Sequence, residues 1–418
     1  MFDRDNWQEI WSTISKNKLR TFLTAFGVFW GIFMLVIMLG SGNGLQHGVL
    51  ADFNGTATNS FFVWTQRTSK PYKGMKPGRN FNFTNDDAIA LRKQIPELDV
   101  IAPQNQLGDY GGANNVVRGL KTGAFAVMAN YPVISKIQAI KIKSGRFLND
   151  NDIRENRKVA VIGKRPSEIL FERGETVLGE YVRINGVYFR VIGITEPTGA
   201  GDQSREQAEA IYIPFTTFQN TFNYGDRVGW FAITSKEDVP ASIAADKAMA
   251  LLKERHSIAP EDLLAIGHWN MEKQFKKLSG LFSGISMLVW FVGIGTLMAG
   301  VIGVSNIMLI VVKERTKEIG IKRAIGATPF AVVSQLILES VFLTSFAGYF
   351  GLVAGIGLLE AVSAALPSGN GSMFSNPSVD LSVALKSLTV LVFSGALAGL
   401  IPAYRAVSIS PVDALRSE

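Results

Sequence analysis

Four long hydrophobic segments alternate with polar segments along this chain of 418 residues. They cover residues 21–41, 278–312, 329–360 and 385–404. A helix needs about 20 predominantly apolar residues to cross a bilayer. The second segment alone holds about 35 consecutive uncharged residues. The pattern therefore predicts a membrane protein with four transmembrane α-helices.

The long polar segment 42–277 predicts a large α+β extracytoplasmic domain inserted between the first and second helices. Strand patterns dominate its middle and helical patterns flank them, which predicts two lobes. We expect a mixed α/β lobe at about 42–140 and 216–277, and a β-rich lobe at about 141–215. About 235 residues are enough to bury a substantial core without disulfides.

Local signals within this domain predict individual elements. Asn185-Gly186 separates two alternating runs, which is a strong signal of a β-hairpin. Thr84, followed by Asn85-Asp86-Asp87, is typical of a helix start. We expect further strands at 61–64, 159–163, 211–214 and 230–233, a helix over 241–255, and a loop at 197–201.

The basic residues indicate which side of the membrane each polar segment occupies. They lie beside hydrophobic segments at 16–20, at 313–323 and at Arg405, whereas the connector 367–380 has none. By the positive-inside rule, both termini, the segment 313–328 and the tail 405–418 are cytoplasmic, and the loop 361–384 is periplasmic. Within 1–20, Trp7, Ile10, Trp11 and Ile14 lie on one helical face and predict an interfacial helix; a helix packed on a soluble core is the alternative. A cleavable signal peptide competes with the first span, but its hydrophobic run is long and no A-x-A-like site follows.

Composition supports this picture and excludes several classes of site. The chain is 47% hydrophobic and 18% charged, with a mean hydropathy of +0.19. Its net charge of +7 could suggest nucleic acid, but no recognition motif accompanies it. Topology and anionic membrane lipid explain the charge better. The absence of cysteine excludes disulfides, thiolate metal sites and cysteine nucleophiles.

Motifs for catalysis or nucleotide binding are missing. Gly163-Lys164 is followed by Arg165, so it is not a phosphate-binding loop. There is no G-x-S-x-G or H-E-x-x-H motif, and His47, His256 and His268 are scattered without ligand spacing. The sequence therefore predicts a non-catalytic chain that binds no cofactor or metal itself.

The charged run 313–323 holds five basic and two acidic residues. Topology needs only the basic ones, whereas the interleaved acids and isoleucines favour a docking surface for another protein. A topology signal without docking is the alternative interpretation. The candidate docking residues are Lys313, Glu314, Arg315, Lys317, Glu318, Ile319, Gly320, Lys322, Arg323, Gly326 and Ala327.

Two further features lie inside the hydrophobic segments. Glu339 is an ionisable residue in the third span. We expect a structural role close to the cytoplasmic surface, paired with Lys322 or Arg323; proton transfer is the alternative. Glycines four apart allow helix backbones to approach closely. These candidate packing pairs are Gly27 and Gly31, Gly351 and Gly355, and Gly395 and Gly399, with Gly280 and Gly284 as a fourth pair.

The charged run and its surroundings resemble the coupling segment of MacB/FtsX-type ABC transporter permeases, the family of macrolide-export and lipoprotein-release systems. The resemblance rests first on residues 314–327, ERTKEIGIKRAIGA. It extends over nearly the whole chain. Further similar segments are 17–24, 159–163, 190–193, 335–340, which contains Glu339, and 411–416.

The resemblance implies a bacterial inner-membrane permease that works as a homodimer or heterodimer. A cytoplasmic ABC ATPase, which binds ATP and Mg, would move the permease. The membrane helices would relay that movement to the periplasmic domain, a mode called mechanotransmission. Because only about twenty residues precede the first span, we expect the ATPase to be a separate chain.

Periplasmic adaptor and outer-membrane exit-duct partners are implied if the system is an efflux pump. A lipoprotein-release permease is one alternative. Another is an FtsX-like membrane anchor that activates a periplasmic enzyme. The sequence does not indicate the substrate.

Overall fold

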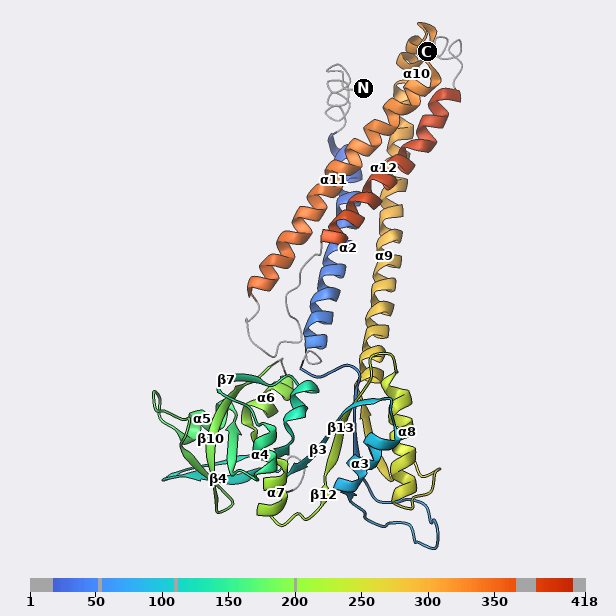
Figure 1. The fold of residues 1–418 in the computed structure, drawn as a ribbon. Coiled ribbons are helices and arrows are strands. Elements are labelled where there is room, and N and C mark those ends of the chain that lie inside the picture. Colours follow the sequence, from blue (N-terminus) through green and yellow to red (C-terminus); the bar gives the residue numbers. More distant parts are fainter. Residues whose placement is uncertain (1–17, 52–54, 109–111, 199–200, 366–380, 409–418) are drawn as a thin grey trace. The chain divides into compact units, whose positions relative to one another are not determined.

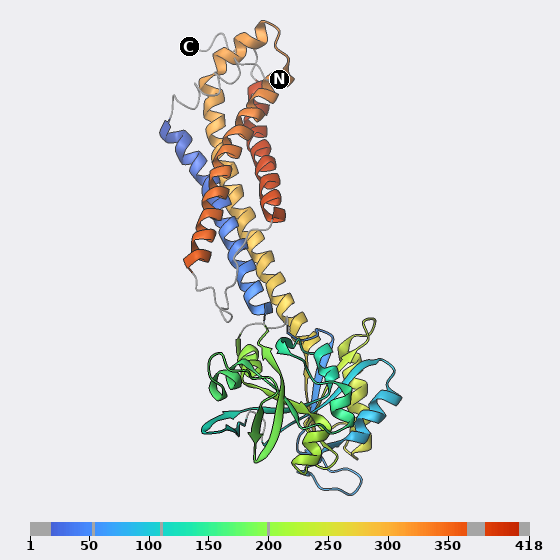
Figure 2. The same ribbon diagram turned by 60° about the vertical axis from the view of Figure 1, so that its left-hand side comes forward.

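The computed structural model describes residues 18–51, 55–108, 112–198, 201–365 and 381–408. The chain divides into two compact units (Figures 1 and 2). One unit is helical and falls within 1–47, 281–368 and 374–418. The other is a mixed α/β unit that falls within 48–280 and 369–373.

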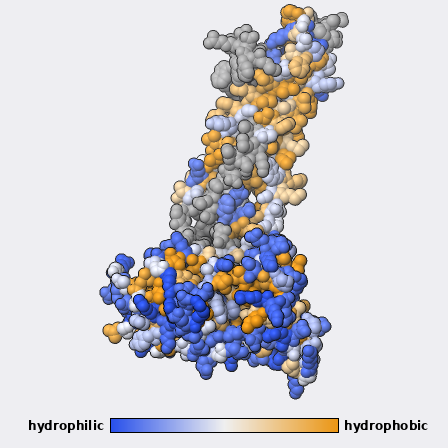
Figure 3. Space-filling model, viewed as in Figure 1, coloured by the Kyte–Doolittle hydropathy of each residue, from blue (hydrophilic) through white to orange (hydrophobic). Residues whose placement is uncertain are grey.

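The helical unit consists of long apolar helices. Three of them are long and apolar enough to cross a membrane, and the fourth carries a shorter apolar stretch, Val392–Ser408. Four transmembrane helices fit this arrangement, and an apolar surface covers them (Figure 3). The long helices are α2 (Lys18–Ala51), α9 (Met271–Glu314), α11 (Pro329–Ala365) and α12 (Leu381–Ser408); a short helix, α10 (Thr316–Ala324), lies between α9 and α11 in the chain.

The helices are longer than the spans predicted from hydrophobicity. α2 extends to Ala51 rather than 41, and α9 begins at Met271 rather than 278. The backbone hydrogen bonds of a helix continue through polar residues. The hydrophobic pattern marks only the part of each helix that is apolar enough to lie in lipid. Most of the interfacial helix predicted at 1–20 lies outside the described residues, and residues 18–20 belong to α2. Most of the loop 361–384 and the tail beyond 408 also lie outside the described residues.

Two buried clusters hold the helical unit together. The first joins Val28 of α2, Val304 and Met308 of α9, and Leu336 of α11. The second lies around Ile32 and is formed by residues such as Leu35, Val289 and Leu359. α2 contributes to both clusters, with Ile32 and Val36 fully buried.

The mixed unit is organised around a sheet in the order β14-β1-β13-β3-β6-β11-β8-β10-β9-β4-β5, with β7 paired to β10. Most neighbours are antiparallel, but β6 pairs with β11 and β8 with β10 in parallel. The strands are β1 (Ser60–Thr65), β3 (Leu98–Gln106), β4 (Asn114–Arg118), β5 (Lys121–Phe125), β6 (Val127–Asn130), β7 (Lys141–Gly145), β8 (Val159–Ile162), β9 (Tyr181–Ile184), β10 (Val187–Glu196), β11 (Ile211–Pro214), β13 (Trp230–Ser235) and β14 (Ile266–Asn270), with β2 (Phe83–Thr84) and β12 (Arg227–Val228) as a separate pair.

Helices cover the sheet and connect its strands. α3 and α8 pack on the largest buried cluster, where Leu91 and Ala244 meet Phe61 and Phe231. Ile134 of the 3₁₀ helix and Ile137, the residue after it, pack in a second cluster with Val100. These helices are α3 (Asn85–Gln94), η1 (Pro132–Lys136), α4 (Asp150–Arg154), α5 (Lys164–Leu170), α6 (Gly201–Glu209), α7 (Phe215–Thr221) and α8 (Ala241–Arg255).

Several predicted elements are confirmed in this unit. β9 and β10 form the predicted hairpin, with Asn185 (φ 42°) and Gly186 (φ 90°) in the turn. Both have the positive φ that a two-residue type I′ turn requires. α3 begins after Thr84, whose backbone N–H donates to Asp87 in a capping box.

The strand pairing does not follow the predicted division into lobes. β4 pairs with β9, which joins 114–125 to the segment predicted as the β-rich lobe, 141–215. The strands of both predicted lobes also belong to one continuous sheet path. Non-local pairing of this kind leaves no mark in the local hydrophobic pattern.

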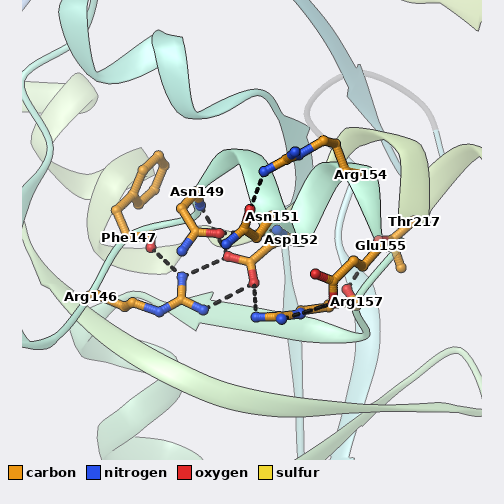
Figure 4. A network of polar contacts seen from close by, with 9 residues as sticks. All are labelled: Arg146, Phe147, Asn149, Asn151, Asp152, Arg154, Glu155, Arg157 and Thr217. Carbon is orange, nitrogen blue, oxygen red and sulfur yellow. Dashed lines mark hydrogen bonds and ion pairs between the residues drawn. The ribbon is translucent and has the colours of Figure 1, made fainter.

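A buried carboxylate fixes the segment that follows β7. Asp152 is fully buried, and Arg146 Nη1 donates to its Oδ2 at 2.6 Å (Figure 4). Asp152 also caps its own helix through the backbone N–H of Asn149, and Arg157 lies 3.6 Å away. Burial raises the pKa of Asp152, but the hydrogen bonds and the two arginines outweigh this effect and lower the pKa. The network is structural.

Candidate coupling site

The charged run forms a short helix between two membrane helices. α9 ends at Glu314, and α10 begins at Thr316. Arg315 joins them, and its backbone N–H still donates to Val311 O at 2.9 Å. The Thr316 hydroxyl donates to Val312 O and Lys313 O, which satisfies carbonyls at the end of α9. α10 is thus attached closely to α9.

The end of α10 depends on a glycine. Gly326 has φ +108°, which favours glycine. The Gly326 N–H donates to Arg323 O, and the Ala327 N–H donates to Lys322 O. This pair of bonds is the Schellman motif. Gly326 and Ala327, two predicted docking residues, therefore end the helix.

The chain then enters α11 at once. Thr328 Oγ1 accepts from the Ala331 N–H at 3.3 Å, and Pro329 is the first residue of the helix. α10 is consequently held between two well-defined helix ends, so its orientation is restricted from both sides.

The structure separates the predicted docking residues into exposed and buried ones. Ile319 and Gly320 are buried, and Ile319 packs in the cluster of Val312 and Val332. Both are thus buried on the face of α10 that packs on the helical unit, and their predicted part in docking stays a prediction. The opposite face is exposed and is called the coupling surface here; it consists of Lys317, Glu318, Ile321, Ala324 and Ile325.

The coupling surface has an apolar centre. Ile321 is 45% exposed and Ile325 is 82% exposed. Phe330, at the start of α11, is 75% exposed and was not predicted. Lys317 and Glu318 carry charge on the same face, and Lys322 Nζ lies 3.5 Å from Glu318 Oε1. An apolar patch with charges at its margin is typical of an interaction site.

Arg315 and Arg323 connect α10 to other helices. Arg315 Nε lies 3.8 Å from Glu318 Oε2, and its Nη1 lies 3.7 Å from Glu339 Oε2 on α11. Arg323 Nη1 donates to Val407 O near the end of α12 at 2.8 Å. The two arginines thus make contacts within the helical unit, and their predicted contact with a partner stays a prediction.

Glu339 is buried, with 6% of the residue exposed. Arg315 forms an ion pair with it across 3.7 Å, a contact that we did not predict. The predicted pairing with Lys322 or Arg323 stays a prediction. Arg315 precedes Lys322 by about two helical turns. It sits where α9 ends and α10 begins, and the bend of the chain there cannot be read from sequence spacing. A partly buried ion pair suits the predicted structural role.

The predicted glycine pairs lie at helix contacts, except for one. A Cβ at Gly351 would lie 2.5 Å from Phe29 O, and one at Gly355 would lie 2.9 Å from Val36 Cγ1. Gly31 faces Leu297, and Gly27 faces Gly300. Gly395 and Gly399 face Thr344 and Ser340. Gly280 and Gly284 have no atom within 4 Å of a Cβ position.

Within the residues that the structure describes, no three His, Cys, Asp or Glu side chains are grouped to hold a metal ion. His256 Nε2 lies 2.7 Å from Asp87 Oδ2 in a structural contact. The other histidines, His47 and His268, lie in α2 and β14.

Comparison with known proteins decides the family. The MacB-like periplasmic core domain matches residues 21–251, and the FtsX-like permease C-terminal domain matches residues 290–411. The chain belongs to the MacB/FtsX-type ABC permease family. It is therefore a multi-pass membrane protein whose mixed unit is a periplasmic domain.

Named relatives are similar over nearly the whole chain. The macrolide export ATP-binding/permease protein MacB of Chlorobaculum tepidum is 30% identical over 416 residues, covering 98% of this chain and 61% of the relative. MacB of Shewanella sp. (strain ANA-3) is 27% identical over 409 residues, covering 97% and 59%. The pyoverdine export protein PvdT of Pseudomonas entomophila is 28% identical over 422 residues, covering 98% and 59%. The chain thus spans about three fifths of the length of these relatives.

The periplasmic domain can also be compared with a solved structure. The periplasmic region of MacB from Actinobacillus actinomycetemcomitans aligns with a TM-score of 0.43 and 22% identity. The alignment covers 55% of this chain and 97% of that one.

Proposed function

We propose that this chain is the permease subunit of an ABC export system in the bacterial inner membrane, with both termini in the cytoplasm. A separate ATPase subunit, which binds ATP and Mg, docks on the coupling surface. The movement that ATP drives passes through the membrane helices to the periplasmic domain and there drives export. The chain itself carries out no catalysis and binds no cofactor.

The observation that carries this proposal is the exposure of Ile321 and Ile325 on a helix whose other face is buried. Leaving two large aliphatic side chains in water forgoes about 1.5–3 kcal/mol each. A protein partner with an apolar groove and charges at its rim would cover both the isoleucines and the adjacent Lys317 and Glu318. Anionic lipid would cover the isoleucines but would repel Glu318.

The attachment of α10 supports transmission as well as binding. Ile319 and Gly320 are buried against the helical unit, and Arg315 and Arg323 tie α10 to α11 and α12. A displacement of α10 would therefore be transmitted to several membrane helices. Mobile cytoplasmic loops would absorb such a push.

The proposed permease works as a dimer, because the family resemblance implies two permease chains. A periplasmic adaptor and an outer-membrane exit duct are the further partners if the system is an efflux pump. Relatives named for macrolide export and for pyoverdine export both match, so the proposal extends to the export of a small or medium-sized compound without fixing its identity.

The test is co-purification of the detergent-solubilised chain with an ABC ATPase subunit from the same organism. The double variant Lys317→Glu with Ile325→Glu changes only exposed side chains of the coupling surface. We expect the wild type to retain the ATPase and the variant to lose at least nine tenths of it. The matched control, Lys277→Glu, changes an exposed lysine at the other end of α9 and should bind as the wild type does.

If the double variant retains as much ATPase as the wild type does, the ATPase interface lies elsewhere. If the wild type fails to bind the ATPase while the ATPase is shown to be present, the transporter proposal itself loses its main support.

A further inference from the structure

The first turn of α9 contacts another helix of the periplasmic domain. α9 runs from Met271 to Glu314 as one helix of 44 residues. Its residues up to Gly280 belong to the mixed unit, and its later residues belong to the helical unit. α9 is therefore one continuous helix that belongs to both units.

α8 lacks a cap of its own. Its N-cap residue is Pro240, which makes no side-chain capping bond, and its first turn has no acidic residue. The N-terminus of a helix exposes unsatisfied N–H groups and carries partial positive charge. This end of α8 thus needs an acceptor from elsewhere.

Glu272, in the first turn of α9, supplies that acceptor. The Ser242 N–H donates to Glu272 Oε2 at 3.1 Å. The Glu272 side chain is only 16% exposed, and Lys276, one turn further along α9, pairs with it. A carboxylate at a helix N-terminus is favourable both as an acceptor and as a counter-charge. α8 is therefore capped by a residue of the helix that leads to the membrane.

An open cleft beside this contact leaves room for movement. It measures about 360 Å³ and lies between the start of α8 and the first turns of α9. Glu272, Phe275 and Lys276 line one side, and Glu237 and Pro240 line the other. The capping bond is a direct polar contact between the first turns of α9 and α8 at the edge of this cleft; β14, which leads directly into α9, also packs against α8.

The other end of α8 is also joined to a buried carboxylate. Arg255 Nε donates to Asp87 Oδ1 at 2.6 Å, and His256 Nε2 lies 2.7 Å from Asp87 Oδ2. Asp87 belongs to the capping box that starts α3. α8 spans about 22 Å at 1.5 Å per residue, so it connects two helix starts that are far apart. Figure 1 shows α8 and α3 in the same part of the periplasmic domain.

The core keeps α8 rigid between these two joints. Ala244, Ala248 and Leu252 are fully buried in the largest cluster, together with Phe61 of β1 and Ile266 of β14. Small residues allow α8 to lie close to the sheet. A displacement of its first turn would therefore move the helix as a body.

We propose that Glu272 is the positioning residue through which α9 moves α8 and, through Arg255, His256 and Asp87, α3. This inference rests on the proposed function, because it requires an ATP-driven movement of α9. It adds the route that the movement takes inside the periplasmic domain. Loss of the capping carboxylate uncouples that route and leaves the membrane helices in place.

The experiment uses the full chain in complex with its ATPase, and hydrogen exchange of the backbone amides as the measurement. Exchange is compared without nucleotide and after trapping with ATP and vanadate. In the wild type, trapping should change exchange in α10, α8 and α3. In Glu272→Ala, the change should persist in α10 and disappear from α8 and α3, and the first turn of α8 should exchange about fivefold faster without nucleotide.

Two further variants separate capping from local disturbance. Glu272→Gln keeps an acceptor oxygen and should restore most of the response in α8. Glu237→Ala removes an exposed carboxylate from the same cleft and should behave as the wild type does.

The outcomes distinguish this proposal from the one it rests on. If Glu272→Ala still shows the nucleotide-dependent change in α8 and α3, the route through Glu272 is wrong. If wild-type α10 itself does not respond to nucleotide, the proposed coupling function fails, and the inference fails with it.

Discussion

Three buried carboxylates hold loops and helix ends of the periplasmic domain in place through hydrogen bonds. Asp87, Asp152 and Asp262 are each almost completely buried, and each accepts several hydrogen bonds. Asp262 receives the backbone N–H groups of Ser69 and Lys70 and so closes a long loop onto the domain. The chain has no cysteine, so disulfides cannot fasten its loops. The hydrogen bonds of these carboxylates hold the loops in place instead.

The Asp87 cluster predicts a specific pH dependence. Burial raises the pKa of Asp87, but hydrogen bonds from His256, Arg255 and Thr84 outweigh burial and lower the pKa from 3.8 to about 2. Because the folded-state pKa is depressed, the stabilisation is present above about pH 4 and is lost as the pH falls towards 2. The shift corresponds to about 2 kcal/mol.

Asp87→Asn should therefore lower the free energy of unfolding at pH 7 by at least about 2 kcal/mol and flatten its decline between pH 4 and pH 2. Circular dichroism during denaturant unfolding of the full chain in detergent measures this. Asp86→Asn, which changes the exposed neighbouring carboxylate, should follow the wild-type curve. A parallel decline in Asp87→Asn and the wild type would contradict the assignment.

Single glycines also determine how closely the membrane helices approach. In Gly351→Ala, the new Cβ would lie 2.5 Å from Phe29 O, a backbone atom that cannot rotate away. We expect a loss of about 1–3 kcal/mol from this overpacking. Gly357→Ala lies on the same helix with nothing within 4 Å and gains only helix propensity. Melting temperatures in detergent compare the two; equal values would mean that α2 and α11 do not pack at Gly351.

In α10, a local signal determines the end of the helix and a tertiary contact determines which face is buried. Its C-terminal glycine fixes where it ends, and the buried Ile319 fixes which face turns inward. Gly326→Ala should loosen this end by about 1–2 kcal/mol, because the positive φ disfavours a side chain. Hydrogen exchange at 322–327 should rise several-fold. Gly303→Ala, in open space within α9, is the control and should leave exchange there unchanged.

The elements that could be predicted from sequence are those with a local cause. The Asn185-Gly186 turn and the capping box at Thr84 require particular residues at particular positions, and both are present. β3, β4 and β5 were not predicted. β3 is Leu98–Gln106 and ends in buried Gln104, Asn105 and Gln106. Because these residues are polar, the sequence lacks the apolar pattern from which a buried strand is recognised.

The candidate site was predictable in outline and not in detail. The charged run marks α10, but spacing alone does not show that Ile319 and Gly320 turn inward or that Glu339 pairs with Arg315. Phe330 was not predicted as part of the exposed surface, because it follows the break after α10 and looks like the start of a membrane span. Glu272 was missed because its partner, Ser242, lies thirty residues earlier in the chain. Only the three-dimensional structure brings these residues together.

In the proposed function, the periplasmic domain and the coupling surface act on opposite sides of the membrane. The periplasmic domain would meet cargo or an adaptor, whereas the coupling surface would meet the ATPase in the cytoplasm. The complete absence of cysteine makes this arrangement directly testable, since any introduced cysteine is the sole thiol in the chain. Two positions are well suited because their side chains are strongly exposed.

Leu120, on the turn between β4 and β5, is fully exposed at 105%, and Ile325 of the coupling surface is 82% exposed. In spheroplasts, Leu120→Cys should react with a membrane-impermeant maleimide, and Ile325→Cys should react only after the membrane is permeabilised. The cysteine-free parent should remain unlabelled in both conditions. Labelling of Ile325→Cys in sealed spheroplasts would put the coupling surface in the periplasm, where no ATP-driven subunit could reach it. That result would leave the family assignment in place, but it would remove the physical route from ATP to the periplasmic domain.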